Sequence, residues 1–228
     1  MVVLFVAAVF AVFVTIDLVQ ERRRRQQLTA EGMTLHDSIS EGEPNFVAGY
    51  ELPEALHYHK NHMWVHWVGP DQAIVGVDDF GRRLLGHPKG IKTPPVGAWV
   101  EQGSRAVKVQ HNGESAHLGA PVSGEVLAVN PRLKSDPDAV HRDNYGQGWL
   151  YKIRSPRLVE QVGNLLDGSL ASRWMEDTRD RFHHQLVLTT GSVIQDGGTT
   201  IDDLASELDS AQWKSLVHEF LEPVDPKA

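Results

Sequence analysis

Four histidines lie within ten residues of one another, at positions 57, 59, 62 and 66. Neutral imidazole is a common ligand of zinc, copper and nickel, so metal binding is the chemistry that this cluster could perform. The surrounding residues alternate as in a β-strand, where successive side chains point to opposite faces. His57 and His59 would then lie on one face, with His62 and His66 on the other. The four rings would not converge, and we expect no metal site here.

Other groups that could do chemistry lack the context that catalysis needs. Ser115 and Ser123 are not in the strand-to-helix turn of a hydrolase nucleophile, and the sequence contains no Gly-rich phosphate-binding loop. The absence of cysteine excludes disulfides, thiol catalysis and cysteine-ligated metals. His183 and His184 follow Arg181 near the expected end of a helix, where we interpret them as capping groups. We therefore expect a protein that is not an enzyme and has no catalytic residues.

The composition favours a globular body that does not bind nucleic acid. The chain has 228 residues, of which 41% are hydrophobic and 23% charged, and its formal net charge is -8. This length is sufficient for one or two domains with a hydrophobic core. Residues 1–30 have a net charge of +2 and residues 31–228 a net charge of -10. Because the body is acidic, it offers no broad basic surface, and we expect no nucleic-acid partner.

The segment from Met1 to Val19 is predominantly apolar and has one charged residue, Asp17, near its end. As a helix it would span about 28 Å, close to the thickness of a bilayer hydrocarbon core. Basic residues stay on the cytoplasmic side of a membrane. The pattern therefore predicts that residues 1–30 form a single transmembrane helix with a basic collar, in the inner (cytoplasmic) membrane, with the N-terminus outside and the body on the cytoplasmic side. The arginines of the collar follow the apolar segment: Arg22, Arg23, Arg24 and Arg25.

The rest of the chain divides into a linker, a β segment and two helical segments. Residues 31–52 mix Gly, Ser, Glu and Pro without a clear period, which is typical of a linker. Between residues 53 and 154, short apolar runs alternate with turn signals, and this spacing indicates a compact all-β barrel or sandwich. A helical pattern follows from Val159 to about Arg181. A second amphipathic helix is predicted from Thr200 to Leu221, with Thr200 as its cap.

Specific motifs occur at both ends of the β segment. The first end reads HYHKNHMWV and then VGVDDFGRRLLG, and the second reads APVSGEV and then NYGQGWL. Together these motifs resemble the glycine cleavage system H protein over residues 53–167. The resemblance implies a mainly β fold, the barrel-sandwich hybrid of H proteins and lipoyl domains. Here we expect that domain to follow a transmembrane helix and to precede a helical C-terminal extension at residues 168–228.

The resembling family attaches lipoate to one lysine, within Glu-Ser-x-Lys at the tip of a hairpin. Counting eight residues back from Pro121 places Gly113 at that position. The tip then reads Gln110, His111, Asn112 and Gly113. Asn-Gly is a strong signal for a tight turn, so we expect the hairpin itself to persist. The resemblance thus implies a lipoyl-type domain without its lipoyl amine, and we expect no bound cofactor.

Three interpretations of this difference stay open. The carrier function is lost and the fold is kept as an interaction module, or Lys108 or another lysine carries lipoate, or the gap-free alignment is misleading. We favour the first, which predicts a membrane-anchored, lipoate-free adaptor or accessory subunit of a membrane protein complex. The alternative is a lipoyl carrier of glycine cleavage or acyl metabolism that is modified on a non-standard lysine, with Lys108 as the nearest candidate.

The C-terminal extension is rich in large apolar side chains, which argues for a folded segment rather than a disordered tail. Exposed together, these side chains would form a patch large enough to bind or to aggregate. We expect one helical face to pack on the β-domain or on a partner subunit, and we favour the partner. The candidate interaction residues are at the hairpin tip and in the last helix: His111, Asn112, Gly113, Trp213, Leu216 and Phe220.

Overall fold

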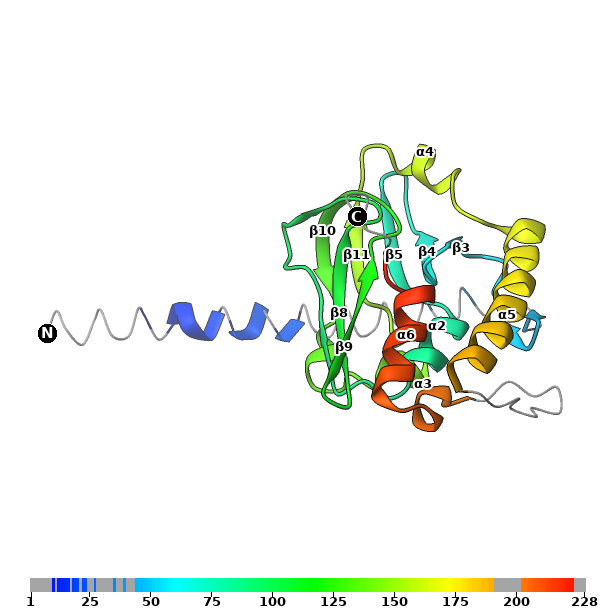
Figure 1. Cartoon of the computed structure of the whole chain (residues 1–228). Coiled ribbons are helices and arrows are strands. Elements are labelled where there is room, and N and C mark those ends of the chain that lie inside the picture. Colours follow the sequence, from blue (N-terminus) through cyan, green and yellow to red (C-terminus); the bar gives the residue numbers. More distant parts are fainter. Residues whose placement is uncertain are drawn as a thin grey trace, which may run out of the picture.

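The computed structural model describes residues 44–190 and 202–223, and upstream of these residues 10, 12–16, 18–20, 22–23, 27, 35 and 39 (Figure 1). The described residues from 10 to 23 are helical, and their large apolar side chains are exposed. In this described part of the chain, no helix is long and apolar enough to cross a membrane. The rest of the predicted span from Met1 to Val19 lies outside the described residues, as do Arg24 and Arg25 of the predicted collar.

Two antiparallel β-sheets form the body of the protein. The strand order is β3-β4-β5-β11-β10-β7 in the larger sheet and β6-β8-β9 in the smaller one. The prediction of a mainly β domain is thus confirmed. The strands of the larger sheet are β3 (His57–His59), β4 (Met63–Trp67), β5 (Gln72–Val77), β11 (Tyr151–Arg154), β10 (Gly124–Val129) and β7 (Trp99–Val100). Those of the smaller sheet are β6 (Gly90–Lys92), β8 (Arg105–His111) and β9 (Glu114–Gly119).

The side chains alternate along these strands as the sequence pattern requires. In β8, Val107 and Val109 are buried, whereas Lys108 and Gln110 point away from the core and are more exposed. In the larger sheet, Gly76 of β5 lies opposite Trp64 of β4. A side chain at position 76 would overlap the Trp64 indole, so this close approach requires glycine. Buried residues of both sheets belong to one hydrophobic core.

Residues 44–52, which the sequence pattern assigns to a linker, are folded. They form a small antiparallel hairpin from β1 (Phe46–Val47) and β2 (Tyr50–Glu51). Farther upstream, Leu35 and Ile39 are also part of the core, with 3% and 5% of their surfaces exposed. Their i, i+4 spacing is that of one helical face, which brings both side chains to the same surface. The region before the β-domain is therefore attached to it at several points.

The helices differ from the sequence prediction in their boundaries. The helix expected from Val159 to Arg181 is divided: the first helix ends at Val162, and the chain then pairs through Leu166 with Tyr58 before the second helix begins at Gly168. The second of these continues to Thr190, so His183 and His184 lie exposed within it and not at its end. The helices are α2 (Asp79–Leu85), the 3-10 helix η1 (Pro131–Lys134), α3 (Ala139–Arg142), α4 (Leu158–Val162), α5 (Gly168–Thr190), the 3-10 helix η2 (Leu204–Glu207) and α6 (Ser210–Phe220).

The last helix, α6, begins ten residues later than expected, at Ser210. Asp209 caps it, because its carboxylate accepts hydrogen bonds from the backbone N–H groups of Ala211 and Gln212, both at 2.9 Å. The Gln212 side chain accepts in turn from the N–H of Asp209, which completes a capping box. Thr200, the predicted cap, lies outside the described residues. The stronger capping box therefore determines where the helix starts.

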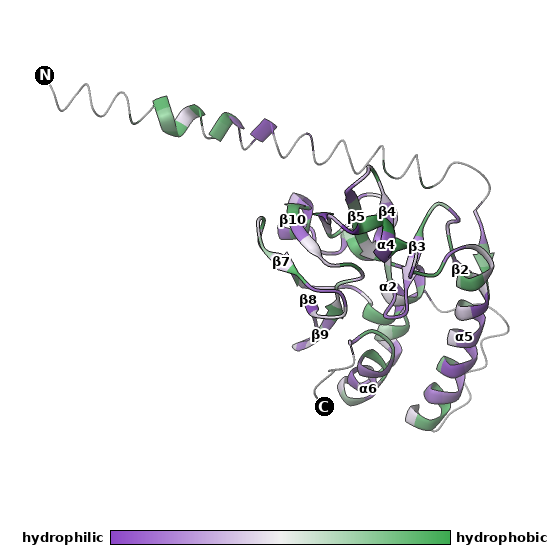
Figure 2. Ribbon diagram, turned by 90° about the horizontal axis from the view of Figure 1, so that it is seen from above, coloured by the Kyte–Doolittle hydropathy of each residue, from purple (hydrophilic) through white to green (hydrophobic). Residues whose placement is uncertain are grey.

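Helix α6 lies between the β8–β9 hairpin and α5 in both views (Figures 1 and 2). It contacts β9, α2 and α5. The 3-10 helix η2 lies against α2, so the whole segment from residue 202 to residue 223 runs along one side of the β-domain. We call residues 202–223 the clasp.

Candidate functional site

The β8–β9 hairpin is the feature that the sequence singles out for function. Its strands pair from Arg105 opposite Gly119 to His111 opposite Glu114. The two turn residues between them, at positions 112 and 113, have φ of 45° and 86°. Two successive left-handed residues are the conformation that an Asn-Gly turn adopts in a tight hairpin. The prediction of a tight turn at this tip is therefore confirmed.

The clasp covers one residue of the tip, His111. The imidazole of His111 stacks on the indole of Trp213, with ring centroids 5.2 Å apart and an interplanar angle of 21°. The Trp213 Nε1–H donates a hydrogen bond of 2.9 Å to the carbonyl oxygen of Leu84, at the end of α2. Because of these contacts only 7% of the surface of His111 and 2% of that of Trp213 are exposed. The turn itself points outward, since open space surrounds the Cβ position of Gly113.

The clasp also covers the edge of the smaller sheet. β9 is an edge strand, and an uncovered edge exposes backbone groups that can pair with another chain. The backbone N–H of His117 donates a 3.0 Å hydrogen bond to Glu222 Oε1, near the end of the clasp. Lys214 Nζ lies 2.6 Å from Glu114 Oε2, directly after the turn. The clasp thus satisfies a backbone donor of β9 and places a lysine amine beside the tip.

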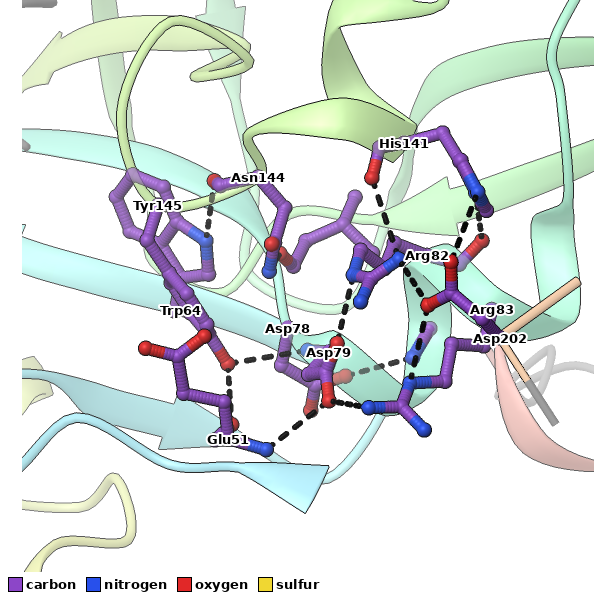
Figure 3. Close-up of polar contacts among 12 residues, drawn as sticks. Glu51, Trp64, Asp78, Asp79, Arg82, Arg83, His141, Asn144, Tyr145 and Asp202 are labelled. Atoms are coloured by element: carbon purple, nitrogen blue, oxygen red, sulfur yellow. Dashed lines mark hydrogen bonds and ion pairs between the residues drawn. The ribbon is translucent and has the colours of Figure 1, made fainter. Parts of the chain in front are cut away.

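The first residues of the clasp bind a basic part of the domain (Figure 3). Asp202 Oδ1 lies 2.9 Å from Arg82 Nη1, and Asp202 Oδ2 lies 3.9 Å from His141 Nε2. Partial burial is the largest single influence and raises the pKa of the Asp202 carboxyl, but the charge and hydrogen bond of Arg82, together with His141 and Arg83, outweigh burial and lower the pKa. Asp203 Oδ2 is 3.7 Å from His87 Nε2. Ion pairs therefore hold the start of the clasp to the domain.

A buried carboxylate positions the arginine of this contact. Asp79 is almost fully buried, and its Oδ1 accepts from Arg82 Nε at 2.6 Å while its Oδ2 accepts from Arg83 Nη2 at 2.7 Å (Figure 3). The same Oδ2 accepts a 3.0 Å hydrogen bond from the backbone N–H of Glu51. The Tyr145 hydroxyl accepts from the Asp79 N–H at 3.0 Å and donates to the Glu51 carbonyl at 2.7 Å. Burial raises the pKa of Tyr145, so this hydroxyl keeps its proton.

The predicted interaction residues of the last helix lie inside this chain. Trp213, Leu216 and Phe220 are 2%, 0% and 5% exposed. Phe220 packs against Phe80 of α2 and Phe182 of α5, with centroids 5.5 and 5.6 Å away. The expectation that this helical face docks on a partner subunit is therefore wrong, because the β-domain and α5 offer an apolar surface that it fills.

The four histidines do not lie on one continuous strand. His57 and His59 are in β3, but His62 is in the turn before β4, where its φ of 60° reverses the chain. Its Nδ1 lies 2.8 Å from Asp78 Oδ2, and its ring stacks against Phe80 at 4.2 Å. The face assignment made from strand alternation is therefore wrong for His62. Within the residues that the structure describes, no group of three or more His, Asp or Glu side chains could hold a metal ion.

Lys108, the alternative lipoyl position, is in the middle of β8 and partly buried. It is paired with Lys92 of β6 on one side and His117 of β9 on the other. The lysine that the structure brings beside the tip is instead Lys214. Sequence reasoning missed it, because only the folding of the clasp onto the hairpin brings it there. Asp202 and Glu222 were missed for the same reason, since no local pattern distinguishes them from other surface carboxylates.

Comparisons with known proteins agree with this fold and its motifs. Residues 56–178 match the family model described as glycine cleavage H-protein. The probable glycine cleavage system H protein of Pyrococcus furiosus is 32% identical over 130 residues, which cover 57% of this chain and 96% of that protein. The glycine cleavage system H protein of Mycolicibacterium smegmatis is 38% identical over 119 residues, or 51% of this chain and 91% of the relative.

A crystal structure of a glycine cleavage system H protein from Mycobacterium marinum is 29% identical, with a TM-score of 0.49, and the match covers 56% of this chain and 98% of that one. The clasp lies beyond the residues that the family model matches. Since that model accounts for more than half of the sequence, the chain belongs to the glycine cleavage H-protein family.

Proposed function

We propose that this protein is a membrane-anchored, lipoate-free member of the H-protein family that acts as a non-catalytic adaptor or accessory subunit of a membrane protein complex. The observation that carries this proposal is the composition of the hairpin tip. Gln110, His111, Asn112 and Gly113 contain no primary amine. Lipoate is attached through an amide to a lysine, so the tip as it stands has no group that could accept it.

The surroundings of the tip support the same proposal. A carrier arm must extend from a tip that partner enzymes can approach. Here the clasp packs beside that tip, with Trp213 stacked on His111 and Glu222 bound to β9. The hairpin is therefore fastened on the side where the clasp lies. A fastened hairpin is better suited to holding a fixed interface than to delivering a group between sites.

The membrane anchor is proposed from the N-terminal sequence. Among the described residues of the apolar segment, Phe10, Phe13 and Leu18 have 68%, 67% and 60% of their surfaces exposed. Apolar side chains on a helix with no protein partner favour lipid over water. Arg22 and Arg23 follow directly. We propose insertion in the inner membrane with the β-domain on the cytoplasmic side.

The alternative function is a lipoyl carrier modified on a non-standard lysine. Lys108 was the candidate from sequence, but its place in the middle of β8 removes it from the tip. Lys214 is a lysine beside the tip, and its ion pair with Glu114 is what favours this alternative. The pair would have to break before the amine could be acylated, because an ammonium group is not a nucleophile.

Intact-mass analysis separates the two functions. The full-length protein, purified in detergent from its lipoate-replete native cells, is expected to have its unmodified mass, with a lipoylated protein from the same cells as the positive control. A lipoyl adduct on any lysine contradicts the lipoate-free proposal, and peptide mapping would then show whether Lys108 or Lys214 carries it. The adaptor role is tested by size-exclusion chromatography in mild detergent, which should recover the chain in a complex of fixed stoichiometry. Recovery only as a free chain would contradict it.

A further inference from the structure

His111 is the contact between the hairpin tip and the clasp. Its ring stacks on Trp213, and its Nε2 accepts a 3.0 Å hydrogen bond from Asn112 Nδ2. Only the neutral imidazole has a lone pair that can accept this bond, because both ring nitrogens of the charged form are donors. The closed clasp is therefore built around an uncharged ring.

The charged groups around His111 come from two neighbouring elements. Burial of the ring is the main influence and lowers its pKa, and the nearby charges of Lys89 and His87, in the loop before β6, lower it further. The His87 backbone and the carboxylate of Asp203, from the clasp, act in the opposite direction. The net effect is a pKa below the ordinary value of 6.5. Lys214 of α6 is paired with the Glu114 carboxylate at 2.6 Å.

We propose that His111 is a titratable lock on the clasp: a neutral ring keeps Trp213 against the hairpin, and protonation of the ring releases Trp213 and exposes His111. The direction follows from linkage, because a group whose pKa is lowered in the closed form favours that form only while it is uncharged. The closed clasp has its full stability above about pH 6.5 and loses the His111 contribution as the pH falls from there towards the pKa of the buried ring.

Two other histidines, His141 and His87, also lie beside the start of the clasp. His141 is 5% exposed, and burial lowers its pKa, so its protonation acts in the same direction as that of His111. His87 also faces the start of the clasp, with its ring nitrogens 2.8 Å from Asp138 and 3.7 Å from Asp203.

At the far end of the clasp, Glu222 lies 3.6 and 3.2 Å from His117 and His218 and accepts the hydrogen bond from the His117 N–H, and none of these contacts involves His111. Acid is therefore expected to open the clasp from the tip, between Asp202 and Trp213, while Glu222 stays bound to β9. The opening is local, which distinguishes it from acid unfolding of the domain.

Hydrogen exchange with mass spectrometry tests this lock on the full-length chain in detergent micelles. After correction for intrinsic exchange, peptides between residues 203 and 213 are expected to lose about tenfold in protection for each unit by which burial lowers the pKa of His111, between pH 7 and pH 5. Peptides of β4 and β5 should keep their protection. Unchanged protection of residues 203–213 over this range would overturn the proposal, and so would an equal loss in β4 and β5.

Two variants assign the effect to His111. His111→Phe keeps an aromatic ring for stacking but cannot be charged, and it is expected to remove most of the pH dependence. His184→Asn, which changes an exposed histidine of α5, is the matched control and should behave as the wild type. A His111→Phe variant with the wild-type pH response would overturn the proposal.

The His111→Phe variant could lose the hydrogen-exchange protection of residues 203–213 already at pH 7. In that case, an NMR titration of the His111 Cε1–H resonance in the wild-type chain still tests the proposal. The proposal requires a pKa below 6.5, and a higher value contradicts it. Neither measurement depends on the membrane anchor or on a partner, so the lock can fail while the proposed adaptor function holds.

Discussion

The indole nitrogen of Trp213 donates a hydrogen bond to the carbonyl of Leu84, 129 residues earlier in the chain, at 2.9 Å. This carbonyl belongs to the last turn of α2, where a helix leaves its carbonyl groups without partners. Trp213 therefore satisfies a carbonyl at the end of α2, and the same hydrogen bond joins the clasp to the domain. The relationship explains why a single side chain connects α2, α6 and the hairpin tip.

Replacement of Trp213 should separate the contributions of packing and hydrogen bonding. Trp213→Ala is expected to lower the free energy of unfolding by about 3–5 kcal/mol, the usual cost of removing a buried large aromatic. Trp213→Phe keeps much of the apolar contact and should lose less, with about 1–3 kcal/mol of its loss due to the unpaired Leu84 carbonyl. Denaturant titration in detergent measures both. Equal losses for the two variants would mean that the indole N–H determines the whole effect.

Restoring a lysine at the tip should not restore lipoylation. Gly113→Lys puts a side chain on a residue with φ of 86°, which costs about 1–2 kcal/mol for an L-residue. The flanking residues remain Gln110 and His111, and Trp213 still packs beside them. In a ligase assay we expect little modification of this variant. The double variant Gly113→Lys/Trp213→Ala tests whether the clasp is the obstacle, and efficient modification of the single variant would show that only the amine had been lost.

Two buried tyrosines provide a matched pair for hydrogen bonding. Tyr145→Phe leaves the Asp79 N–H and the Glu51 carbonyl without their partner, and it is expected to lower stability by about 1–3 kcal/mol. The Tyr151 hydroxyl is buried and has no hydrogen-bond partner within the described part of the chain. Tyr151→Phe should therefore be neutral or stabilising. Thermal unfolding of the two variants side by side measures the difference, and a larger loss at position 151 would contradict this assignment.

The two carboxylates that bind Arg82 should differ strongly in their contributions. Asp79 is buried and pairs with two arginines, and Asp79→Asn removes the buried negative charge that binds both, at a cost of about 3–5 kcal/mol. Asp202 has 69% of its side chain exposed, so Asp202→Asn should change stability by about 0–1 kcal/mol.

The contribution of the Asp202–Arg82 ion pair to the free energy of unfolding should depend on pH. Because the pKa of Asp202 is lowered in the fold, its small contribution is present above the ordinary carboxyl pKa and is lost as the pH falls through the lowered value. Unfolding curves of Asp202→Asn and wild type should therefore converge in acid. A wild-type advantage that persists at the lowest pH would refute the assignment of the ion pair.

The proposed topology has a direct test in membranes. With four arginines after the apolar segment, the β-domain should be protected from protease in intact cells and digested in inverted vesicles. An outer-face membrane protein digested in intact cells is the control for protease activity. Digestion of the β-domain from outside would reverse the orientation.

Local signals in the sequence were sufficient for the β-domain. Trp64 and Gly76 pack together because the Trp64 ring occupies the space that a side chain at position 76 would need. Asn112 and Gly113 form their tight turn because both residues readily adopt a left-handed backbone. The clasp could not be placed in this way. Whether Trp213 packs on its own domain or on a partner depends on the complementarity of surfaces far apart in sequence, and periodicity records only that one face is apolar.

Backbone reversals also limited the prediction of the site. The pattern around His62 looks like a continued strand, yet the left-handed conformation of this residue turns the chain and buries the ring beside Asp78. A non-glycine residue at positive φ carries no reliable mark in a single sequence. The start of α6 was misplaced because Thr200 and Asp209 are both good caps, and only the second completes its reciprocal bond with Gln212.

The burial of Leu35 and Ile39 limits how far the domain can travel from its proposed anchor. Eleven residues separate Arg23 from Leu35, and even fully extended they reach about 40 Å. A domain held within that radius of a bilayer meets a membrane-bound neighbour at a higher local concentration than two proteins free in solution would. Affinity that would be too weak to detect between free proteins is then enough to keep such a pair associated, so its partner is best sought with the membrane intact.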